Sequence, residues 1–532
     1  MKKIILFIFL AINQLGISQI SNYNLVLEPL TIQGLQGIQS FAFGQFEGKW
    51  LVVGGRLDGL HRRQPWASFD ANGNNNQLIV IDPVNKLKWS RPLSELPTSI
   101  QEQLSSTNPN FFQDGNTLYY VGGYGYSVTA VNHITYPKLT AINLQGVISG
   151  IMNNLPITQY FRQITDNAFA VSGGRIEKIY ETFYLVGGHR FDGRYNPANN
   201  PTFTQAYTNQ IRKFNIIDDG INLQITHLSP FTDTANLHRR DYNVASQIMP
   251  DGSEGITAFS GVFQLTADLP YLNCVNIDSN GYQVNNNFSQ YYNHYHCAHL
   301  PVYDSINNEM HTFFFGGISQ YYDSSGVLVQ DNNVPFVKTI ARVSRDASGI
   351  MAEYKLAVDM PGLLGSGSEF IANKQISHYE NNVLKLNEMQ SDTILAGYIF
   401  GGISSTLPNI FFINTGMESS ASSQIYKVLF VNSSPSNIAT LNPQSVGSLH
   451  IQVYPNPNGG DFSINYHLKQ TTDVSIVIYD TAGKILKNEI IKSSTKGNKV
   501  FSTELNNGNT TGIYFVTLKT SYETASQKII VE

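Results

Sequence analysis

One short pattern recurs six times along most of this chain: an apolar or aromatic stretch that ends in two glycines or a close equivalent. The copies stand at residues 50–55 (WLVVGG), 118–123 (LYYVGG), 183–188 (FYLVGG), 256–261 (ITAFSG), 313–317 (FFFGG) and 398–402 (YIFGG). Successive copies begin their glycine pairs 56 to 85 residues apart. Units that repeat in this way cannot bury their faces alone, so the pattern indicates an array in which each unit packs on its neighbours.

Each repeated unit reads as four short strands. In the first unit these are residues 40–47, 50–55, 77–82 and 87–93. The third strand of later units recurs at 138–143, 211–216, 272–278 and 339–344. Short apolar runs bounded by turn residues favour strands over helices, so the repeated region is expected to be all-β.

Two glycines after the second strand, an apolar third strand and, in the first unit, Trp89 after it together resemble the kelch motif. The other units lack this tryptophan, and the period exceeds the roughly 50 residues of a kelch repeat. The resemblance implies a six-bladed kelch-like β-propeller over residues 19–432. The alternating strands of the C-terminal segment predict a small β-sandwich after it. An irregular β-sandwich is the alternative, and six similar units disfavour it.

The last repeated unit lacks an outer strand before the chain becomes polar and rich in Ser and Pro at 432–436. Residues 23–30 (YNLVLEPL) end in the same Leu-x-x-Pro-Leu manner as the outer strand around Trp89. We therefore expect residues 23–30 to be the outer strand of the sixth unit. Such a strand would close the ring and leave no exposed edge that invites aggregation.

The first residues have the order of a secretory signal peptide: Lys2 and Lys3, an apolar run over 4–12, and small residues before Gln19. The apolar run is shorter than the roughly 20 residues that span a bilayer. We expect residues 1–18 to be a signal peptide and the mature chain to have no transmembrane anchor.

From about residue 449 the sequence changes character, after a predicted linker over 433–448. Its motifs are Tyr-Pro-Asn-Pro at 454–457, alternating strands such as 474–479, Asp-x-x-Gly-Lys at 480–484, Gly-Ile-Tyr at 512–514 and Lys-Ile-Ile-Val at 528–531. In this order they closely resemble the type A sorting domain of type IX secretion cargo in the Bacteroidota. The resemblance implies recognition by the type IX translocon, removal by a sortase-like peptidase, and a secreted or outer-membrane surface-attached protein. A generic adhesive sandwich is the alternative.

The charge and the cysteine count of the chain limit which kinds of partner and crosslink it can have. Charged residues make up 14% of the chain and the net charge is -5, which gives no basic excess for nucleic acid or an anionic membrane surface. Cys274 and Cys297 are too few for a disulfide framework. Two buried thiols are the simpler interpretation, and one isolated disulfide bond is the alternative.

Cationic and aromatic side chains gather on one predicted face. Because the strands of a unit run up and down in turn, loops that enter the first strand and loops that join the second to the third emerge on the same face, here called the loop face. Long loops in compact folds are usually functional or disordered. The candidate ligand-binding residues there are Arg56, His61, Arg62, Trp66, His189, Arg190, Arg194, His238, Arg239, Arg240, Asp241, His294 and His296.

Such residues suit an anionic or hydroxyl-rich ligand, because guanidinium binds carboxylate or phosphate through two hydrogen bonds and aromatic faces stack on sugar rings. The alternative is that Arg and Asp side chains pair with one another to hold long loops. His294 and His296, two apart on an expected inner strand, would point to the same side as a metal pair does. No third ligand is fixed by spacing, so no cofactor is predicted, and a metal there stays the less favoured alternative.

The function expected from the sequence is a secreted or cell-surface propeller that binds a glycan, or another extracellular ligand such as a protein, on its loop face. Whether the protein is an enzyme stays open. The alternative is a carbohydrate-active enzyme on a kelch scaffold, either mutarotase-like with acid–base groups such as His238 and Asp241, or copper radical oxidase-like. The oxidase would need a Cys crosslinked to a Tyr beside a copper site, for which Cys297 near Tyr295 and His296 is suggestive, although the sequence does not single out the other copper ligands.

Overall fold

The structure is a computed structural model that describes residues 23–196, 202–324, 327–389, 391–432, 449, 451–480, 485–505, 511–521 and 524–532. The chain divides into two compact units, Met1–Ser434 and Pro435–Glu532. The predicted signal peptide (1–18) and linker (433–448) lie outside the described residues. Both units are built from β-strands; the described part of the first unit adds two short α-helices, α1 (Thr98–Leu104) and α2 (Leu144–Met152).

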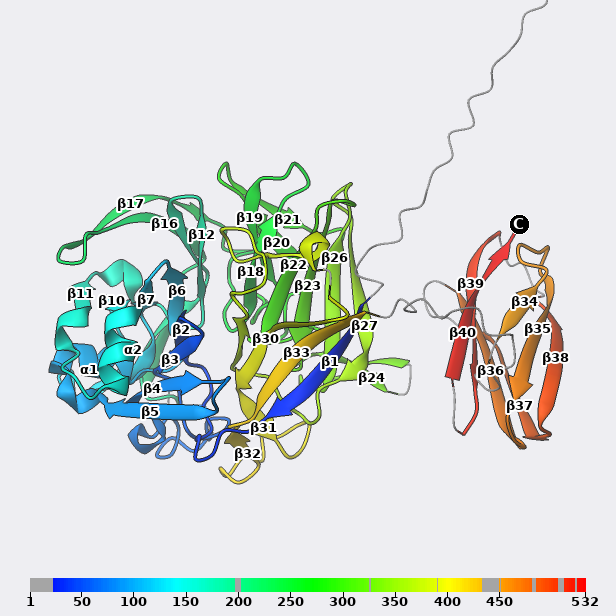
Figure 1. The fold of residues 1–532 in the computed structure, drawn as a ribbon, viewed down its shortest axis with the longest axis horizontal. Coiled ribbons are helices and arrows are strands. Elements are labelled where there is room, and N and C mark those ends of the chain that lie inside the picture. The colour runs from blue at the N-terminus through cyan, green and yellow to red at the C-terminus, as the bar shows by residue number, and fades with distance from the viewer. Residues whose placement is uncertain are drawn as a thin grey trace, which may run out of the picture. The chain divides into compact units, whose positions relative to one another are not determined.

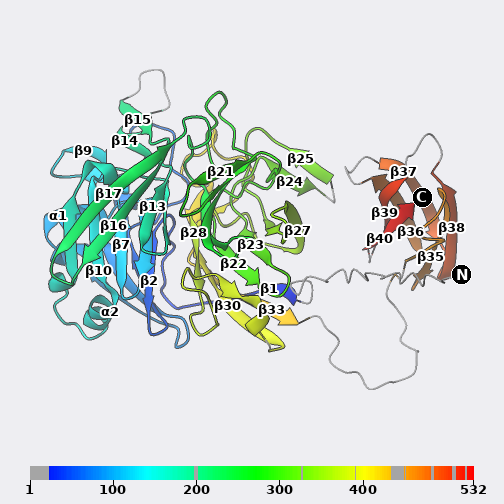
Figure 2. The same cartoon turned by 90° about the horizontal axis from the view of Figure 1, so that it is seen from above.

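Six largely antiparallel sheets follow one another along the described part of the first unit (Figures 1 and 2). The first three contain β2 (Ala42–Phe46), β3 (Lys49–Val53), β4 (Gln77–Asp82) and β5 (Leu87–Pro92); β6 (Asn110–Asp114), β7 (Thr117–Val121), β10 (Lys138–Asn143) and β11 (Phe161–Thr165); and β12 (Arg175–Ile179), β13 (Thr182–Val186), β16 (Gln210–Asp218) and β17 (Leu223–Thr232). The next two contain β18 (Asn243–Ile248), β19 (Glu254–Phe259), β20 (Cys274–Ile277) and β21 (Tyr282–Asn285); and β22 (His299–Asp304), β23 (Glu309–Phe315), β26 (Thr339–Arg345) and β27 (Met351–Asp359), with β29 (Leu384–Lys385) parallel to β22.

The sixth sheet joins the two ends of the first unit. Its order is β28 (Ser368–Ala372), β30 (Thr393–Gly401), β33 (Ile425–Asn432) and β1 (Tyr23–Leu30). All of β1 pairs antiparallel with β33, from Tyr23 opposite Asn432 to Leu30 opposite Ile425, and the two strands lie side by side in Figure 1. Pro29 is tolerated in β1 because an edge strand does not need every backbone N–H for pairing.

The repeated glycine pairs lie where each sheet meets the loop that enters the next one. At Gly122, with φ of 66°, an added Cβ would lie 1.9 Å from the carbonyl oxygen of Val171, so only glycine fits. The second glycine donates its N–H to a carbonyl of that loop in five units: Gly55 to Ser106 (2.8 Å), Gly123 to Val171 (3.1 Å), Gly188 to Arg239 (2.7 Å), Gly317 to Leu364 (2.8 Å) and Gly402 to Ile38 (2.8 Å). The last of these bonds links the sixth sheet to the first.

Apolar cores fill the spaces between adjoining sheets. One cluster joins the first two sheets through Val53 and Tyr120. Equivalent clusters lie between the later pairs. Another joins the sixth sheet to the first, where the Trp50 ring lies 5.0 Å from that of Tyr398. The first strands of the sheets also contact one another in chain order, β2 to β6, β12, β18, β22 and β28.

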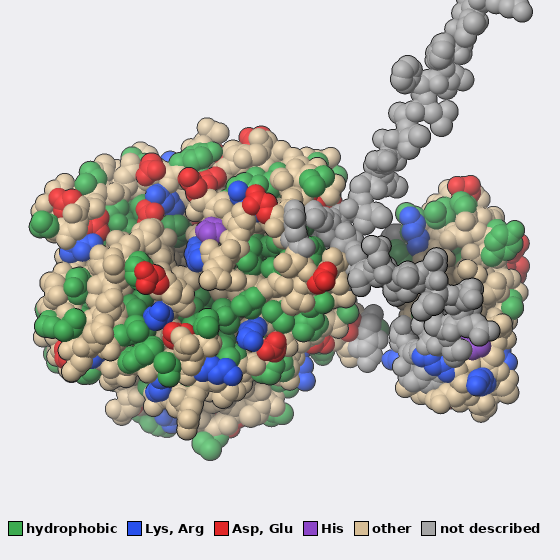
Figure 3. Space-filling model, viewed as in Figure 1, with side chains coloured by type: hydrophobic (Ala, Val, Ile, Leu, Met, Phe, Trp, Pro, Cys, Tyr) green, Lys and Arg blue, Asp and Glu red, His purple; other side chains and the backbone are tan. Residues whose placement is uncertain are grey.

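Four of the long connections between second and third strands form hairpins of their own. Their strands are β8 (Tyr124–Ser127) and β9 (Asn132–Thr135), β14 (His189–Gly193) and β15 (Phe203–Tyr207), β24 (Tyr321–Ser324) and β25 (Val327–Gln330), and β31 (Ile403–Ser405) and β32 (Ser419–Ala421). These hairpins shape the loop face. On the face of the first unit seen in Figure 3, acidic and basic side chains are interspersed rather than gathered by sign.

The second unit is a β-sandwich with its own core. One sheet has β34 (Gln452–Tyr454), β35 (Asp461–Leu468) and β38 (Gly497–Glu504); the other has β37 (Ile485–Ser494), β36 (Thr472–Asp480), β39 (Gly512–Lys519) and β40 (Thr524–Val531). Alternate residues of β35 and β39, among them Ile464 and Val516, are buried between the sheets, as one-sided sheets require. Within the part of the chain that the structure describes, no helix has the length and apolar character needed to cross a membrane.

Candidate functional site

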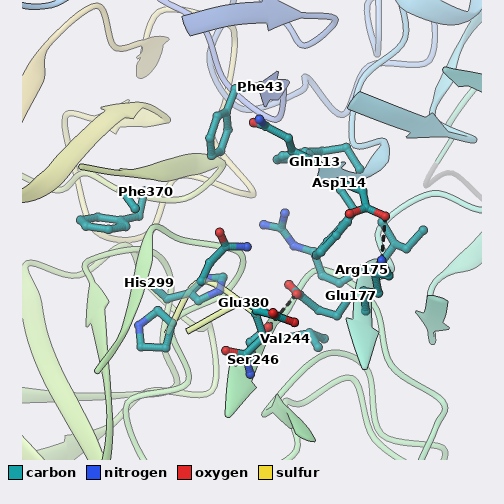
Figure 4. Close-up of a pocket in the computed structure, with 18 of the residues that line it drawn as sticks. Phe43, Gln113, Asp114, Arg175, Glu177, Val244, Ser246, His299, Phe370 and Glu380 are labelled. Atoms are coloured by element: carbon teal, nitrogen blue, oxygen red, sulfur yellow. Dashed lines mark hydrogen bonds and ion pairs between the residues drawn. The ribbon is translucent and has the colours of Figure 1, made fainter. Parts of the chain in front are cut away.

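The first strands of the six sheets surround a pocket of about 670 Å³, here called the axial pocket (Figure 4). Every one of these strands, β2, β6, β12, β18, β22 and β28, contributes to its lining. Its outer lining includes Gly115, Tyr180 and Glu181, which lie in the turns between first and second strands. Because Arg175 and His299 begin β12 and β22, the axial pocket runs from the first residues of these strands to the turns at their end away from the loop face.

A buried ion pair lies in the axial pocket. The two terminal nitrogens of Arg175 donate to Oε1 of Glu369 at 3.0 and 3.1 Å, and the side chains of His296 and Glu369 are joined by an Nε2–H to Oε1 bond of 3.0 Å. Arg175 is 7% exposed and Glu369 4%. Burial raises the pKa of Glu369, but Arg175 and the bond from His296 outweigh it and hold that pKa below its usual value. Glu369 is therefore a carboxylate, and its Oε2 has no hydrogen-bond partner among the described residues.

A second carboxyl in the pocket behaves differently. Glu177 on β12 accepts a hydrogen bond from the Ser246 hydroxyl at 3.0 Å. Burial raises its pKa to about 7, since the bond from Ser246 and the charge of Arg175 offset burial only in part. Near neutral pH, Glu177 thus exchanges a proton readily while Glu369 stays ionised. Two carboxyls whose pKa values are separated by their surroundings are a common arrangement for acid–base chemistry.

Aromatic and imidazole groups complete the walls. Phe43, Phe111, Phe112 and Phe370 line the pocket, and Figure 4 shows Phe370 and His299 on the side opposite Gln113 and Asp114. Burial, followed by the charge of Arg175, lowers the pKa of His299 to about 4, so its ring is neutral. Apolar walls with a few convergent polar groups are typical of small-molecule sites, and this set offers both donors and acceptors.

The pocket carries more acidic than basic side chains. Arg175 is paired with Glu369, and Lys178 with Asp114 at 2.8 Å. The remaining charged lining residues are Glu181, Glu254 and Glu380, against one further cation, Lys374. An anionic ligand would meet this excess of carboxyl groups, whereas a neutral ligand rich in hydroxyls would not.

Replacing Glu177 by Gln should change how stability depends on pH. The pKa of Glu177 is about 7 in the folded protein and usually 4.5, so the folded state holds a proton that the unfolded state releases between these values. The contribution of Glu177 is thus full below about pH 4.5 and is lost as pH rises through 7.

Glutamine cannot ionise, so the free energy of unfolding of Glu177→Gln should increase relative to that of the native chain as the pH rises from 5 to 8. Urea unfolding of both proteins at the two pH values measures this difference, and the contribution of Glu353, whose buried carboxyl has a pKa of about 8, cancels between them. Parallel changes in the two proteins would contradict the assignment.

Several arginines predicted to bind a ligand instead hold loops together. Arg56 is buried and donates to Asp58 and Asn74 at 2.6 to 2.8 Å. Arg239 is 1% exposed, donates to the backbone oxygens of Ser260 and Asn273, and lies 4.1 Å from the Tyr271 ring. These two guanidinium groups have no surface to offer a ligand.

Two further arginines also contact the chain itself. Arg190 is exposed and pairs with Asp192 at 2.6 Å, and Arg194 donates to the backbone oxygen of Ser68 at 2.7 Å. Arg56, Arg190, Arg194 and Arg239 therefore follow the alternative interpretation of the sequence, in which these side chains hold long loops. Arg62 and Trp66 are exposed, Trp66 by 76%.

Other predicted residues come together in a loop-face cluster of Arg240, Asp241, His61, His189, Tyr207 and His238. Arg240 donates to Tyr207 Oη at 2.8 Å and to Asp241 at 3.1 Å. The His238 ring stacks on Tyr207 with centroids 3.7 Å apart. The charges of Arg240 and Asp241 both act on the pKa values of His61 and His189, which burial lowers to about 4 and about 3. Both imidazoles are neutral.

The expectation that His294 and His296 share one side of an inner strand is wrong. Both residues precede β22 and have positive φ, 50° and 24°, so the chain there is not extended. His294 donates from Nδ1 to the backbone oxygen of Gly316 at 2.7 Å, whereas His296 bonds Glu369. Among the described residues, no group of three or more His, Cys, Asp and Glu side chains is placed to hold a metal ion.

The two cysteines are free and buried. Cys297 donates its thiol to the backbone oxygen of Ala298 at 3.3 Å, and burial raises its pKa to about 12. His294 and His296 have different partners, so these two imidazoles do not form a metal-binding pair.

Sequence reasoning missed Arg175, Glu177, His299 and Glu369 as functional candidates. They come from three sheets, and Arg175 and Glu369 lie 194 residues apart. The one signal in the sequence was that charged residues occupy first strands, where a strand buried in an apolar core would have apolar residues. Without knowing which sides of those strands face the axis, that signal cannot be separated from ordinary surface residues.

Comparison with known proteins identifies the second unit. Residues 452–532 match the family model described as the secretion system C-terminal sorting domain. This match confirms the sorting domain predicted from the sequence, and such a domain implies export of its cargo to the cell surface or the medium. No curated protein sequence matches the chain.

Solved structures resemble the chain only distantly. YjhT is 11% identical and superposes over 59% of this chain and 83% of its own, with a TM-score of 0.35. A fungal alcohol oxidase of the AA5 family, solved with copper, is 9% identical over 96% and 99%, with a TM-score of 0.36. Latent PorU from Porphyromonas gingivalis is 9% identical over 73% and 36%, with a TM-score of 0.14. Scores this low carry no argument about the site.

Proposed function

We propose that the first unit is a closed six-bladed kelch-like propeller that the type IX system exports, and that it binds a glycan or another hydroxyl-rich extracellular ligand. Closure is supported by three features of the sixth sheet: the pairing of its N-terminal strand β1 with β33, the bond from Gly402 to Ile38, and the apolar cluster that the sheet shares with the first sheet. The translocon and a sortase-like peptidase are the partners of the sorting domain in this proposal, which the family match supports.

The observation that carries the binding function is the axial pocket. It combines phenylalanine walls with the open Oε2 of Glu369, the Glu177 carboxyl and the neutral His299 ring. Sugar hydroxyls both donate and accept hydrogen bonds, and aromatic side chains pack on the apolar faces of sugar rings. The excess of carboxyl groups favours a neutral sugar over an acidic one in this pocket.

Glycan-array binding of the whole chain, followed by titration of the best ligand, tests this proposal. Phe370→Ala and Glu177→Gln should each weaken binding about fivefold or more, since each removes a contact of about 1 kcal/mol or more. Arg190→Gln is the matched control, because the Arg190 side chain is exposed, pairs with Asp192 and does not line the axial pocket. Binding that survives both pocket substitutions but falls with the control would place the ligand elsewhere.

Catalysis on the bound sugar is the second candidate function. The separated pKa values of Glu177 and Glu369 provide a proton donor and a carboxylate in one pocket, as a mutarotase-like enzyme requires. Proton NMR of a bound reducing sugar distinguishes the two candidates: faster exchange of its anomers that Glu177→Gln abolishes supports catalysis, and unchanged exchange with tight binding supports a binding protein.

A further inference from the structure

A tyrosine hydroxyl at the loop end of the first unit has no partner. Tyr295 is 9% exposed, and its Oη is buried without a hydrogen bond among the described residues. Its ring packs in an apolar cluster with Val262, Phe263 and Phe336. Leaving a buried hydroxyl unpaired is costly, so an unpaired one points to a partner from outside the chain.

The charge of Arg240 acts on the pKa of Tyr295, and part of the Arg240 guanidinium is open. Its carbon Cζ is 5.3 Å from the centre of the Phe263 ring, which belongs to the same apolar cluster as Tyr295. Nε and Nη1 are used by Tyr207 and Asp241, whereas Nη2 has no partner in the part of the chain that the structure describes. Asp241 is itself satisfied, since it also accepts from Asn108 at 2.6 Å.

His189 adds a third donor. Its Nδ1 lies 2.6 Å from Nε2 of Gln205, and an amide nitrogen that donates to Nδ1 leaves the ring proton on Nε2. The ring is buried and lies 5.7 Å from that of Tyr207, the partner of Arg240. Arg240 Nη2, the Tyr295 hydroxyl and His189 Nε2 are thus three donors without a partner among the described residues, and the charges of Arg240 and Asp241 act on the pKa values of both Tyr295 and His189.

We propose that Arg240, Tyr295 and His189 bind the carboxylate of an acidic sugar of the uronic acid class. A carboxylate accepts hydrogen bonds only, which matches a set of donors, and a guanidinium nitrogen gives the strongest of them. Flat rings suited to stacking against a sugar lie nearby: His238 on Tyr207, and His61 between Phe69 and Tyr195 at 4.7 and 4.9 Å.

None of Arg240, Tyr295 and His189 lines the axial pocket. The axial pocket has an excess of carboxyl groups, whereas the loop-face site has one cation, one satisfied carboxylate and neutral histidines. The axial pocket therefore favours a neutral ligand, and the loop-face site an acidic one.

Calorimetric titration of the whole chain at pH 7 with trigalacturonate tests the proposal, and trigalactose is the neutral probe of equal length. The uronate should bind at least about tenfold more tightly than the neutral sugar. Tyr295→Phe, which removes only the oxygen, should weaken uronate binding about tenfold without lowering the thermal midpoint, because that oxygen makes no bond inside the chain. Arg240→Lys, which keeps the charge but loses Nη2, should weaken it similarly.

Arg190→Gln removes another loop-face cation and should leave uronate binding unchanged. Equal binding of both probes, or full uronate affinity in Tyr295→Phe and Arg240→Lys, would overturn the site. A hexaglutamate peptide that binds as tightly as the uronate would overturn the assignment to a sugar. Loss of uronate binding in Glu177→Gln would place the uronate in the axial pocket and also overturn the loop-face site. Failure of neutral glycans to bind the axial pocket would contradict the proposed function of that pocket but not the loop-face site.

Discussion

Deletion of residues 23–30 should abolish cooperative unfolding of the first unit and cause the protein to associate. All eight residues of β1 pair with β33, and Leu25 and Leu30 are buried. Each of these side chains contributes about 1.5 to 3 kcal/mol by burial, and the backbone pairing of β33 is lost as well. Domain stabilities are only about 5 to 15 kcal/mol, and the exposed edge of β33 offers a template for another chain.

Calorimetry and light scattering measure both effects. Glu28→Gln is a matched control within β1, because it removes only the exposed ion pair with Lys427, a change of less than about 1 kcal/mol. An unfolding midpoint in the deletion variant equal to that of the native chain, with no association, would show that β1 is dispensable.

Removal of the Glu369 carboxylate should have the second large effect. Glu369→Ala leaves the buried Arg175 guanidinium uncompensated and takes the acceptor from His296. Breaking a buried ion pair from one side costs about 3 to 5 kcal/mol. Urea unfolding at pH 7 should show a loss of this size, together with loss of ligand binding in the axial pocket.

The double variant Arg175→Met with Glu369→Leu separates charge burial from packing. Replacing both members of a buried pair by apolar side chains is often neutral for stability, so the double variant should recover most of the loss while still failing to bind the ligand. A cost below about 1 kcal/mol for Glu369→Ala alone would mean that Arg175 finds water or another partner.

Strand positions were largely predictable because they follow local rules. The segments 77–82 and 138–143 coincide with β4 and β10, and 23–30 with β1, since apolar runs bounded by turns specify strands within a few residues. The glycine pairs could also be found in the sequence, because the close approach of the backbone at Gly122 excludes any side chain and so requires glycine there. The hairpins within the long loops, such as β14 and β15, were not predicted, because their pairing joins segments of little apolar alternation.

The candidate site was harder to predict than the fold. Whether an arginine binds a ligand or a backbone carbonyl depends on neighbours that are distant in sequence. Arg239 is enclosed by backbone oxygens, whereas the adjacent Arg240 keeps one guanidinium nitrogen open. Likewise His296 reaches Glu369 only because its backbone leaves the extended conformation. Such turns and long-range pairs leave no spacing signal along the chain.

A crystal structure of the whole chain with the neutral oligosaccharide selected on the array would test the central claim most directly. The account predicts a sugar ring in the axial pocket, within hydrogen-bond distance of Glu177 or of Oε2 of Glu369 and packed on at least one of its phenylalanine rings. A saturated complex with the sugar only on the loop face, and the axial pocket holding water alone, would contradict it.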